Sequence, residues 1–229
     1  PMGMIGEFTV TNVGNTQTYV PDDNFENALI NLGLDNILDN YVATASIDTV
    51  TILNVSSKNI ADLTGIEDFT ALLELNCSEN QLSELDVSHN TYLSTLDCSD
   101  NYLTSLNLSQ NTALTLLRCY NNQLSTLDVK NGNNTYFLHI FSHFATQNNP
   151  NLYCINVDDA NWSTANWTSI DPQHYFSDNC SATDIEEHST NKKLLKVTDL
   201  FGREIKELKN ILLFFLYNDG TVEKKIILE

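Results

Sequence analysis

Apolar residues between Leu72 and Asn134 recur with a period of 21 residues. The chain reads LLELNCSENQLSELDVSHNTY, then LSTLDCSDNYLTSLNLSQNTA, and then LTLLRCYNNQLSTLDVKNGNN. Each unit contains the pattern twice, first as L-x-x-L-x-C-x-x-N and then as L-x-x-L-x-[VL]-x-x-N, except that Gly132 takes the place of the final asparagine in the third unit. A repeat of this length predicts a solenoid, in which one coil cannot bury its own leucines but a stack of coils can.

The alternation inside each unit predicts short strands. In a strand, successive side chains point to opposite faces, so Leu75 and Cys77 should face inward and Asn76 outward. Cys77, Cys98 and Cys119 share the inward position and are predicted to be buried free thiols that pack as small apolar groups. Their side chains should run parallel, so a disulfide between neighbouring coils would be strained.

The repeated asparagines follow each strand, where the chain turns. An amide side chain can donate twice and also accept, so it can satisfy backbone groups of neighbouring coils that would otherwise be buried without a partner. We therefore predict that these residues form structural ladders inside the solenoid and do not bind a ligand: Asn80, Asn101, Asn122, Asn90 and Asn111.

Both ends of the solenoid need caps, because an open end exposes apolar surface and strand edges. Residues 16–49 predict a helical N-terminal cap in which Pro21 and two aspartates precede the helix and Gly33 ends it. Its apolar side would consist of Phe25, Leu29, Ile30, Leu32 and Leu34. Residues 1–15 are interpreted as vector-derived or disordered, and the natural precursor is expected to carry a signal peptide.

The solenoid itself is predicted over 50–158, with uncertain register across Asn131–Gln147. Residues 159–182 should form the C-terminal cap, and the alternative is that their aromatic side chains form a carbohydrate platform: Trp162, Trp167, Tyr175 and Phe176.

Charge divides the chain. Residues 183–229 contain 9 of the 30 acidic residues and 8 of the 11 basic residues. Residues 1–182 therefore contain 21 acidic and 3 basic residues. This step predicts two domains joined by a linker over 183–191. Within 192–229, three apolar runs around Asn218-Asp219-Gly220 predict a small antiparallel β-domain with a hairpin. The expected fold is therefore mainly β and poor in helix.

The repeats resemble the 21-residue bacterial leucine-rich repeats written LxxLxCxxNxLxxLDLxxNxx, over about residues 50–158. The segment from VPDDNFENALINLGL to DLTGIEDF is similar to the N-terminal cap of secreted Bacteroidetes repeat proteins. Residues 192–229 resemble the C-terminal sorting domain of the type IX secretion system. The matching residues are Asp199, Gly202, Arg203, Glu204, Tyr217, Asp219, Gly220, Lys224 and Lys225. This resemblance implies export through the periplasm, interaction with the type IX machinery, and a secreted or surface-attached protein.

Two further cysteines, Cys154 and Cys180, flank the predicted C-terminal cap. In an exported protein such a pair predicts a disulfide. The loop-entropy model gives it a stabilisation of about 3 kcal/mol.

No catalytic motif is present, so we expect neither enzymatic activity nor a cofactor. His139 and His143 lie four residues apart in a strand-like segment, which argues against a metal site. The pairs Asp22-Asp23 and Asp158-Asp159 are interpreted as turn caps rather than calcium ligands.

The acidic repeat region should repel nucleic acid, and no apolar run is long enough to span a membrane.

Binding is the function that remains. The candidate residues point outward from the predicted strands, and the third coil differs in presenting larger side chains: Glu74, Asn76, Thr95, Asp97, Leu116, Arg118 and Tyr120. Arg and Tyr are enriched where interfaces are strong. We expect an extracellular adhesion or recognition module for a protein or glycan. The alternatives are a structural surface-layer protein without a specific ligand and, more weakly, an ice-binding protein.

Overall fold

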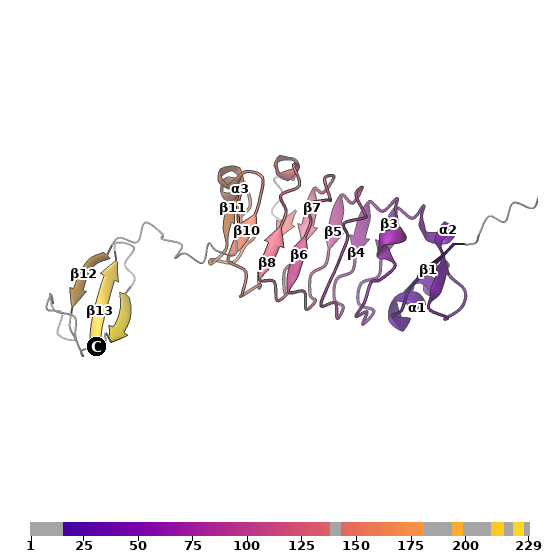
Figure 1. The fold of residues 1–229 in the computed structure, drawn as a ribbon, viewed down its shortest axis with the longest axis horizontal. Helices are drawn as coiled ribbons and strands as arrows, with labels where there is room; N and C mark the ends of the chain where they lie inside the picture. Colours follow the sequence, from indigo (N-terminus) through magenta and orange to yellow (C-terminus); the bar gives the residue numbers. More distant parts are fainter. Residues whose placement is uncertain (1–15, 138–142, 181–193, 199–211, 218–221, 227–229) are drawn as a thin grey trace, which may run out of the picture. The chain divides into compact units, whose positions relative to one another are not determined.

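The computed structural model describes residues 16–137, 143–180, 194–198, 212–217 and 222–226. The chain forms two compact units, residues 1–180 and residues 181–229 (Figure 1). The matches to the type IX sorting domain at Asp199, Gly202, Arg203, Glu204, Asp219 and Gly220 lie outside the described residues, as does His139.

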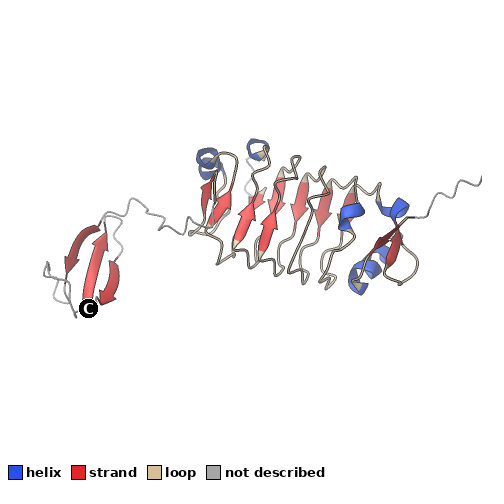
Figure 2. Cartoon of the chain, in the orientation of Figure 1, coloured by secondary structure: helices blue, strands red, loops and turns tan. Residues whose placement is uncertain are grey.

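The first unit is a solenoid with two parallel sheets (Figures 1 and 2). The first sheet contains β3 (Ile52–Asn54), β4 (Glu74–Asn76), β5 (Thr95–Asp97), β7 (Leu116–Arg118) and β9 (Phe144–Ala145) in that order. An additional parallel bridge joins Ala145 to Ser169. The second sheet contains β6 (Ser105–Asn107), β8 (Thr126–Asp128), β10 (Cys154–Asn156) and β11 (Tyr175–Ser177). In the units that begin at Leu93 and Leu114, the first half thus contributes a strand to the first sheet and the second half contributes one to the second sheet.

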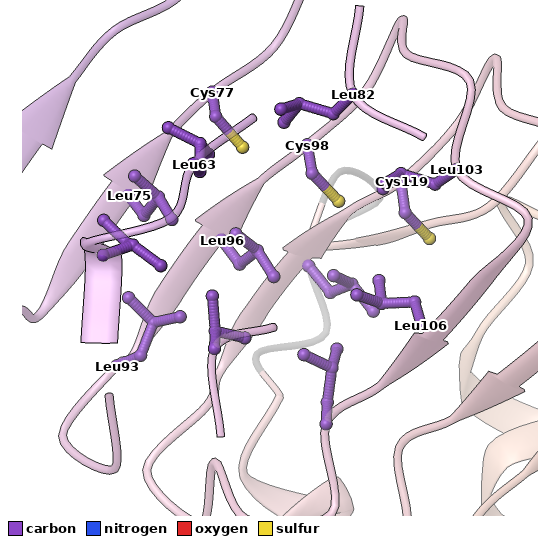
Figure 3. Close-up of a cluster of buried hydrophobic side chains, with 14 of the residues drawn as sticks. Leu63, Leu75, Cys77, Leu82, Leu93, Leu96, Cys98, Leu103, Leu106 and Cys119 are labelled. Carbon is purple, nitrogen blue, oxygen red and sulfur yellow. The ribbon is translucent and has the colours of Figure 1, made fainter. Parts of the chain in front are cut away.

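The strands stack in register, which confirms the predicted leucine-rich-repeat arrangement of short parallel strands. Leu75 of β4 pairs with Leu53 and with Leu96 in the adjacent coils. Leu75 and Leu96, with Cys77 and Cys98 two positions further on, lie in columns in the core (Figure 3). Because every coil repeats the same inward positions, the buried apolar surface is continuous along the stack.

Two rows of asparagine side chains lie inside the turns. In the first row, Nδ2 of Asn101 donates to the carbonyl oxygens of Cys77 and Cys98, at 3.0 and 3.2 Å. Its Oδ1 accepts from the N–H of Leu82 at 3.0 Å. Asn80, Asn122 and Asn149 make equivalent bonds between coils. In the second row, Asn90 and Asn111 are fully buried and donate to carbonyl oxygens of the preceding coil.

The N-terminal cap combines an antiparallel pair of strands, β1 (Gln17–Tyr19) and β2 (Tyr41–Ala43), with α1 (Asp23–Asn31), α2 (Thr44–Ile47) and the 3-10 turn η1 (Ile66–Asp68). Asp22 caps α1 by accepting from the N–H groups of Asn24 and Phe25. Its other oxygen accepts from the N–H groups of Ala61 and Asp62, which fixes the helix to the first coil.

One prediction for this cap was wrong. Leu32 does not join the apolar side of α1 but is 51% exposed, because the helix ends at Asn31 and Leu32 occupies its C-cap. Gly33 follows with a φ of +75°, a left-handed conformation that glycine adopts without steric cost.

The C-terminal end of the solenoid is closed by aromatic rings, α3 (Ala160–Asn166) and a 3-10 turn η2 (Asn134–Tyr136). Trp167 stacks on Phe144 with ring centroids 3.9 Å apart and also contacts Phe137 and Phe176. Trp167 and Phe176 are buried, so these two rings seal the core and are not presented as a carbohydrate platform.

The second unit contains β12 (Leu194–Thr198), β13 (Leu212–Tyr217) and β14 (Val222–Ile226), which form an antiparallel sheet with β13 in the centre. The predicted hairpin turn at 218–220 lies outside the described residues.

Candidate binding face

The seven candidate residues lie on β4, β5 and β7 of the first sheet or directly after it. Glu74, Thr95 and Leu116 form one outward row, because they are register partners in adjacent strands. Asn76, Asp97 and Arg118 form the next row by the same register. The outer surface of this sheet, called the binding face below, therefore brings the residues of three coils together.

Two of these side chains have a structural task in the turns. Oδ1 of Asn76 accepts from the backbone N–H of Ser78 at 3.1 Å and from its hydroxyl at 2.8 Å. Asp97 accepts from the N–H and hydroxyl of Ser99 at 3.2 and 2.7 Å. These bonds replace backbone partners that the chain lacks where it leaves the strand. Asn76 and Asp97 therefore stabilise the scaffold, whether or not they also contact a ligand.

The third coil departs from this arrangement. At the position of Asn76 and Asp97 it has Arg118, and at the position of the two serines it has Tyr120. Nη1 of Arg118 lies 3.4 Å from Oδ2 of Asp97, and the Arg118 side chain is 36% exposed. This ion pair holds the guanidinium against the sheet while part of it faces solvent.

Arg118 and Tyr120 line an open hollow of about 610 Å³ at the carboxyl ends of β7 and β9. The other lining residues are Asn121, Ala145, Gln147, Asn148 and Ser169. Its volume falls within the range of about 300–1,000 Å³ that is usual for ligand sites.

The rim of the hollow is held by side-chain hydrogen bonds across coils. Nδ2 of Asn148 donates to Oδ1 of Asn121, and Nδ2 of Asn121 donates to Oδ1 of Asp100, at 2.5 and 2.6 Å. Asn121 and Asn148 both have positive φ, at 53° and 58°. Asparagine tolerates this conformation better than most residues, so the rim has a defined shape.

Sequence reasoning missed the residues that complete the hollow. Gln147 and Asn148 follow a coil whose sequence departs from the repeat, and Ser169 belongs to the segment after α3. The bridge between Ala145 and Ser169 and the hydrogen bond from the N–H of Thr146 to the carbonyl oxygen of Ser169 show that these segments are neighbours. No sequence pattern could have indicated this contact.

The remaining predicted residues lie away from the binding face. Cys77, Cys98 and Cys119 are buried free thiols. Burial raises the pKa of Cys77 to about 12 and also raises that of Cys98 and Cys119. Cys154 and Cys180 form a disulfide with Cα atoms 5.9 Å apart, next to the second sheet.

Within the described ranges, no group of three or more His, Cys, Asp or Glu side chains could hold a metal ion, and no helix is long and apolar enough to cross a membrane.

Known proteins are similar to this chain in sequence. No protein-family model matches the sequence. Internalin J of Listeria monocytogenes serotype 4b is 34% identical over 86 residues, which is 36% of this chain and 9% of internalin J. The chain thus corresponds to a small part of that relative.

Solved structures of internalins are also similar. The functional domain of InlJ from Listeria monocytogenes, which includes a cysteine ladder, is 25% identical with a TM-score of 0.46, covering 62% of this chain and 38% of that domain. Internalin InlF from the same species is 18% identical with a TM-score of 0.44. The similarity covers 69% of this chain and 56% of the InlF chain. Over 86 residues, the chain is thus similar in sequence to a part of internalin J, and its own strands form the leucine-rich-repeat arrangement described above.

Proposed function

We propose that the chain is an internalin-like binding module that acts at the cell surface or outside the cell, without catalytic activity. The partner is a protein or a glycan, and it contacts the binding face around Arg118 and Tyr120. The observation that carries this proposal is the hollow, because it gathers the outward residues that depart from the repeat. The relation of the repeats to internalin J supports a surface location.

The chemistry of the hollow favours recognition over catalysis. Its side chains provide a guanidinium, a phenol, amides, a hydroxyl and a methyl group. The lining contains no carboxylate, imidazole or thiol, so its groups suit hydrogen bonding to a ligand. The lining therefore resembles a binding surface.

A capture experiment with the full chain tests this proposal. The immobilised chain is exposed to cell-surface proteins and to a glycan array, beside a double variant with Arg118→Gln and Tyr120→Ala. A matched control variant carries Lys58→Gln and Tyr92→Ala, which remove a positive charge and a phenol at exposed positions outside the hollow. We expect the control to retain the captured partner and the double variant to lose it. Equal capture by both variants would favour the alternative of a structural surface-layer protein without a ligand at this face.

We further propose that residues 192–229 direct export through the type IX secretion system. The resemblance in sequence supports this, together with the separate compact unit formed by residues 181–229. Fusing 192–229 to an unrelated periplasmic reporter should carry that reporter across the outer membrane of a host that has this system. Retention of the reporter in the periplasm would show that this segment is a terminal β-unit without a role in export.

A further inference from the structure

We propose that the hollow binds a sugar that carries a single carboxylate, such as a uronic acid residue in a glycan. This inference rests on the proposed function, because it assigns the ligand class of the same face. It is carried by the charge, the hydrogen-bonding groups and the size of the hollow.

The hollow differs in charge from the acidic chain around it. Residues 1–182 contain 21 acidic and 3 basic residues, yet the seven residues that line the hollow include Arg118 and no carboxylate. Arg118 is held in place by Asp97 and is partly exposed. A guanidinium is a fork of N–H donors that matches a carboxylate. The hollow is thus a local exception to an acidic surface, and one that can accept an anionic group.

The number of charges on the ligand is also limited. The excess of acidic residues around the hollow should repel a polyanion, because charges within a Debye length of about 8 Å interact strongly at physiological ionic strength. Three acidic residues contact residues that line the hollow: Asp97 contacts Arg118, Asp100 contacts Asn121, and Asp171 accepts from the backbone N–H of Asn148. A ligand with one carboxylate among neutral groups fits this field better than a chain of carboxylates.

The neutral groups of the hollow fit a sugar. The Tyr120 hydroxyl and the Gln147 amide have no hydrogen-bond partner within the described part of the chain, and both side chains are half-buried. A phenol and an amide can each donate to and accept from sugar hydroxyls. The Tyr120 ring offers an apolar surface for the C–H groups of a sugar ring. A hollow of about 610 Å³ takes a small group of this kind, whereas a folded protein surface needs a larger area.

The pairing with Asp97 provides a sharp test. A ligand carboxylate must compete with Asp97 for the guanidinium, so Asp97→Asn should tighten binding. The substitution preserves the turn, because Asn54 and Asn76 make the same two bonds to Ser56 and Ser78 at the equivalent position. Any gain in affinity would then report on charge and not on folding.

The experiment measures binding of methyl β-glucuronide and methyl β-glucoside to the full chain by titration calorimetry or NMR. We expect the glucuronide to bind about ten-fold more tightly, as for one charge-assisted contact. Arg118→Gln should abolish this preference, and Lys58→Gln, which removes a positive charge outside the hollow, should not. Asp97→Asn should strengthen binding of the glucuronide more than binding of the glucoside.

Four outcomes would overturn the inference. Equal binding of the two sugars would show that the carboxylate is not recognised, and a preference that survives Arg118→Gln would place the site elsewhere. Stronger binding of N-acetyl-aspartate amide than of the glucuronide would identify an acidic peptide instead. If no sugar binds but the capture experiment yields a protein lost in the Arg118→Gln, Tyr120→Ala variant, the inference fails while the proposed function stands.

Discussion

The side-chain amide of Asn101 donates to the carbonyl oxygen of Cys77, 24 residues earlier in the chain and 3.0 Å away. The same amide group bonds to its own coil through Cys98 and accepts from Leu82. One buried side chain thus satisfies backbone groups of two successive coils. The stack depends on such bonds as well as on its apolar columns.

Asn101→Ala should therefore lower the free energy of unfolding by about 1–3 kcal/mol, because it leaves buried backbone groups without partners. Gln123→Ala removes an amide from an exposed position and should change stability by no more than about 0.5 kcal/mol. Denaturant melts of the two full-chain variants measure both values. Similar losses in the two variants would show that the ladder contributes little.

The three repeat thiols should be inert in the native protein. Burial raises the pKa of Cys77 to about 12, and the neighbouring thiols Cys98 and Cys119 are equally buried. The reactive thiolate is therefore scarce and inaccessible at pH 8. Mass spectrometry after iodoacetamide treatment should find no labelled cysteine in the native chain and three in the denatured, unreduced chain. Labelling of Cys98 under native conditions would contradict the closed core.

The disulfide should hold the last strand of the second sheet. Cys154 of β10 is the register partner of Tyr175 in β11, and Cys180 follows that strand by three residues. Lys130 also donates from Nζ to the carbonyl oxygen of Asp178 at 2.7 Å. The segment that leaves β11 is thus tied back to β10 and to the residue after Val129.

Replacing both Cys154 and Cys180 by serine should reduce stability by about 3 kcal/mol on the loop-entropy model. Hydrogen exchange should accelerate first at the amides of Tyr175 and Val157, which link β11 to the coil before it. Exchange at the backbone amide of Leu103, in a central coil of the stack, serves as the internal reference. Unchanged protection at Tyr175 would contradict the proposed role of the disulfide.

His174 should make the C-terminal cap sensitive to acid. Burial lowers its pKa below the ordinary value of 6.5, although the carbonyl oxygen of Asn149 and the charge of Asp171 act in the opposite direction. The unfolded state therefore binds a proton first as pH falls. The stability contributed by neutral His174 is complete above pH 6.5 and is lost as pH falls below 6.5 towards the native pKa.

The measurement compares the full chain with His174→Gln in melts at pH 7.5 and pH 5. The wild-type chain should lose more stability between the two pH values than the variant, since glutamine cannot be protonated. His89→Gln, at an exposed position, is the control and should behave as the wild-type chain does. An identical pH dependence in His174→Gln would rule out the proposed titration.

The repeat sequence predicted the scaffold well because each coil must bury apolar side chains at the same inward positions. Leu75 and Cys77 are buried and Glu74 is exposed, as alternation in a strand demands. Where the spacing changes, the prediction stops: Asn149 continues the ladder of Asn122, but 27 residues later instead of 21. The extra residues of that coil concealed its register.

The binding face was predictable only in part. Arg118 and Tyr120 depart from the repeat and therefore drew attention in the sequence. Asn76 has the same outward orientation, yet its side chain is committed to the turn with Ser78. Period-two alternation shows which side chains point outward, but it does not show which of them the scaffold uses.

The most direct test of the account is a hydroxyl-radical footprint of the full chain with and without a captured partner. Tyr120 lies in the hollow, whereas Tyr92, Tyr102 and Tyr153 are 64%, 54% and 60% exposed outside it and serve as internal references. We predict that the bound partner protects Tyr120 from oxidation and leaves the three reference tyrosines unprotected. Protection of Tyr153 on the second sheet, with Tyr120 oxidised as in the free chain, would contradict the claim that the first sheet is the binding face.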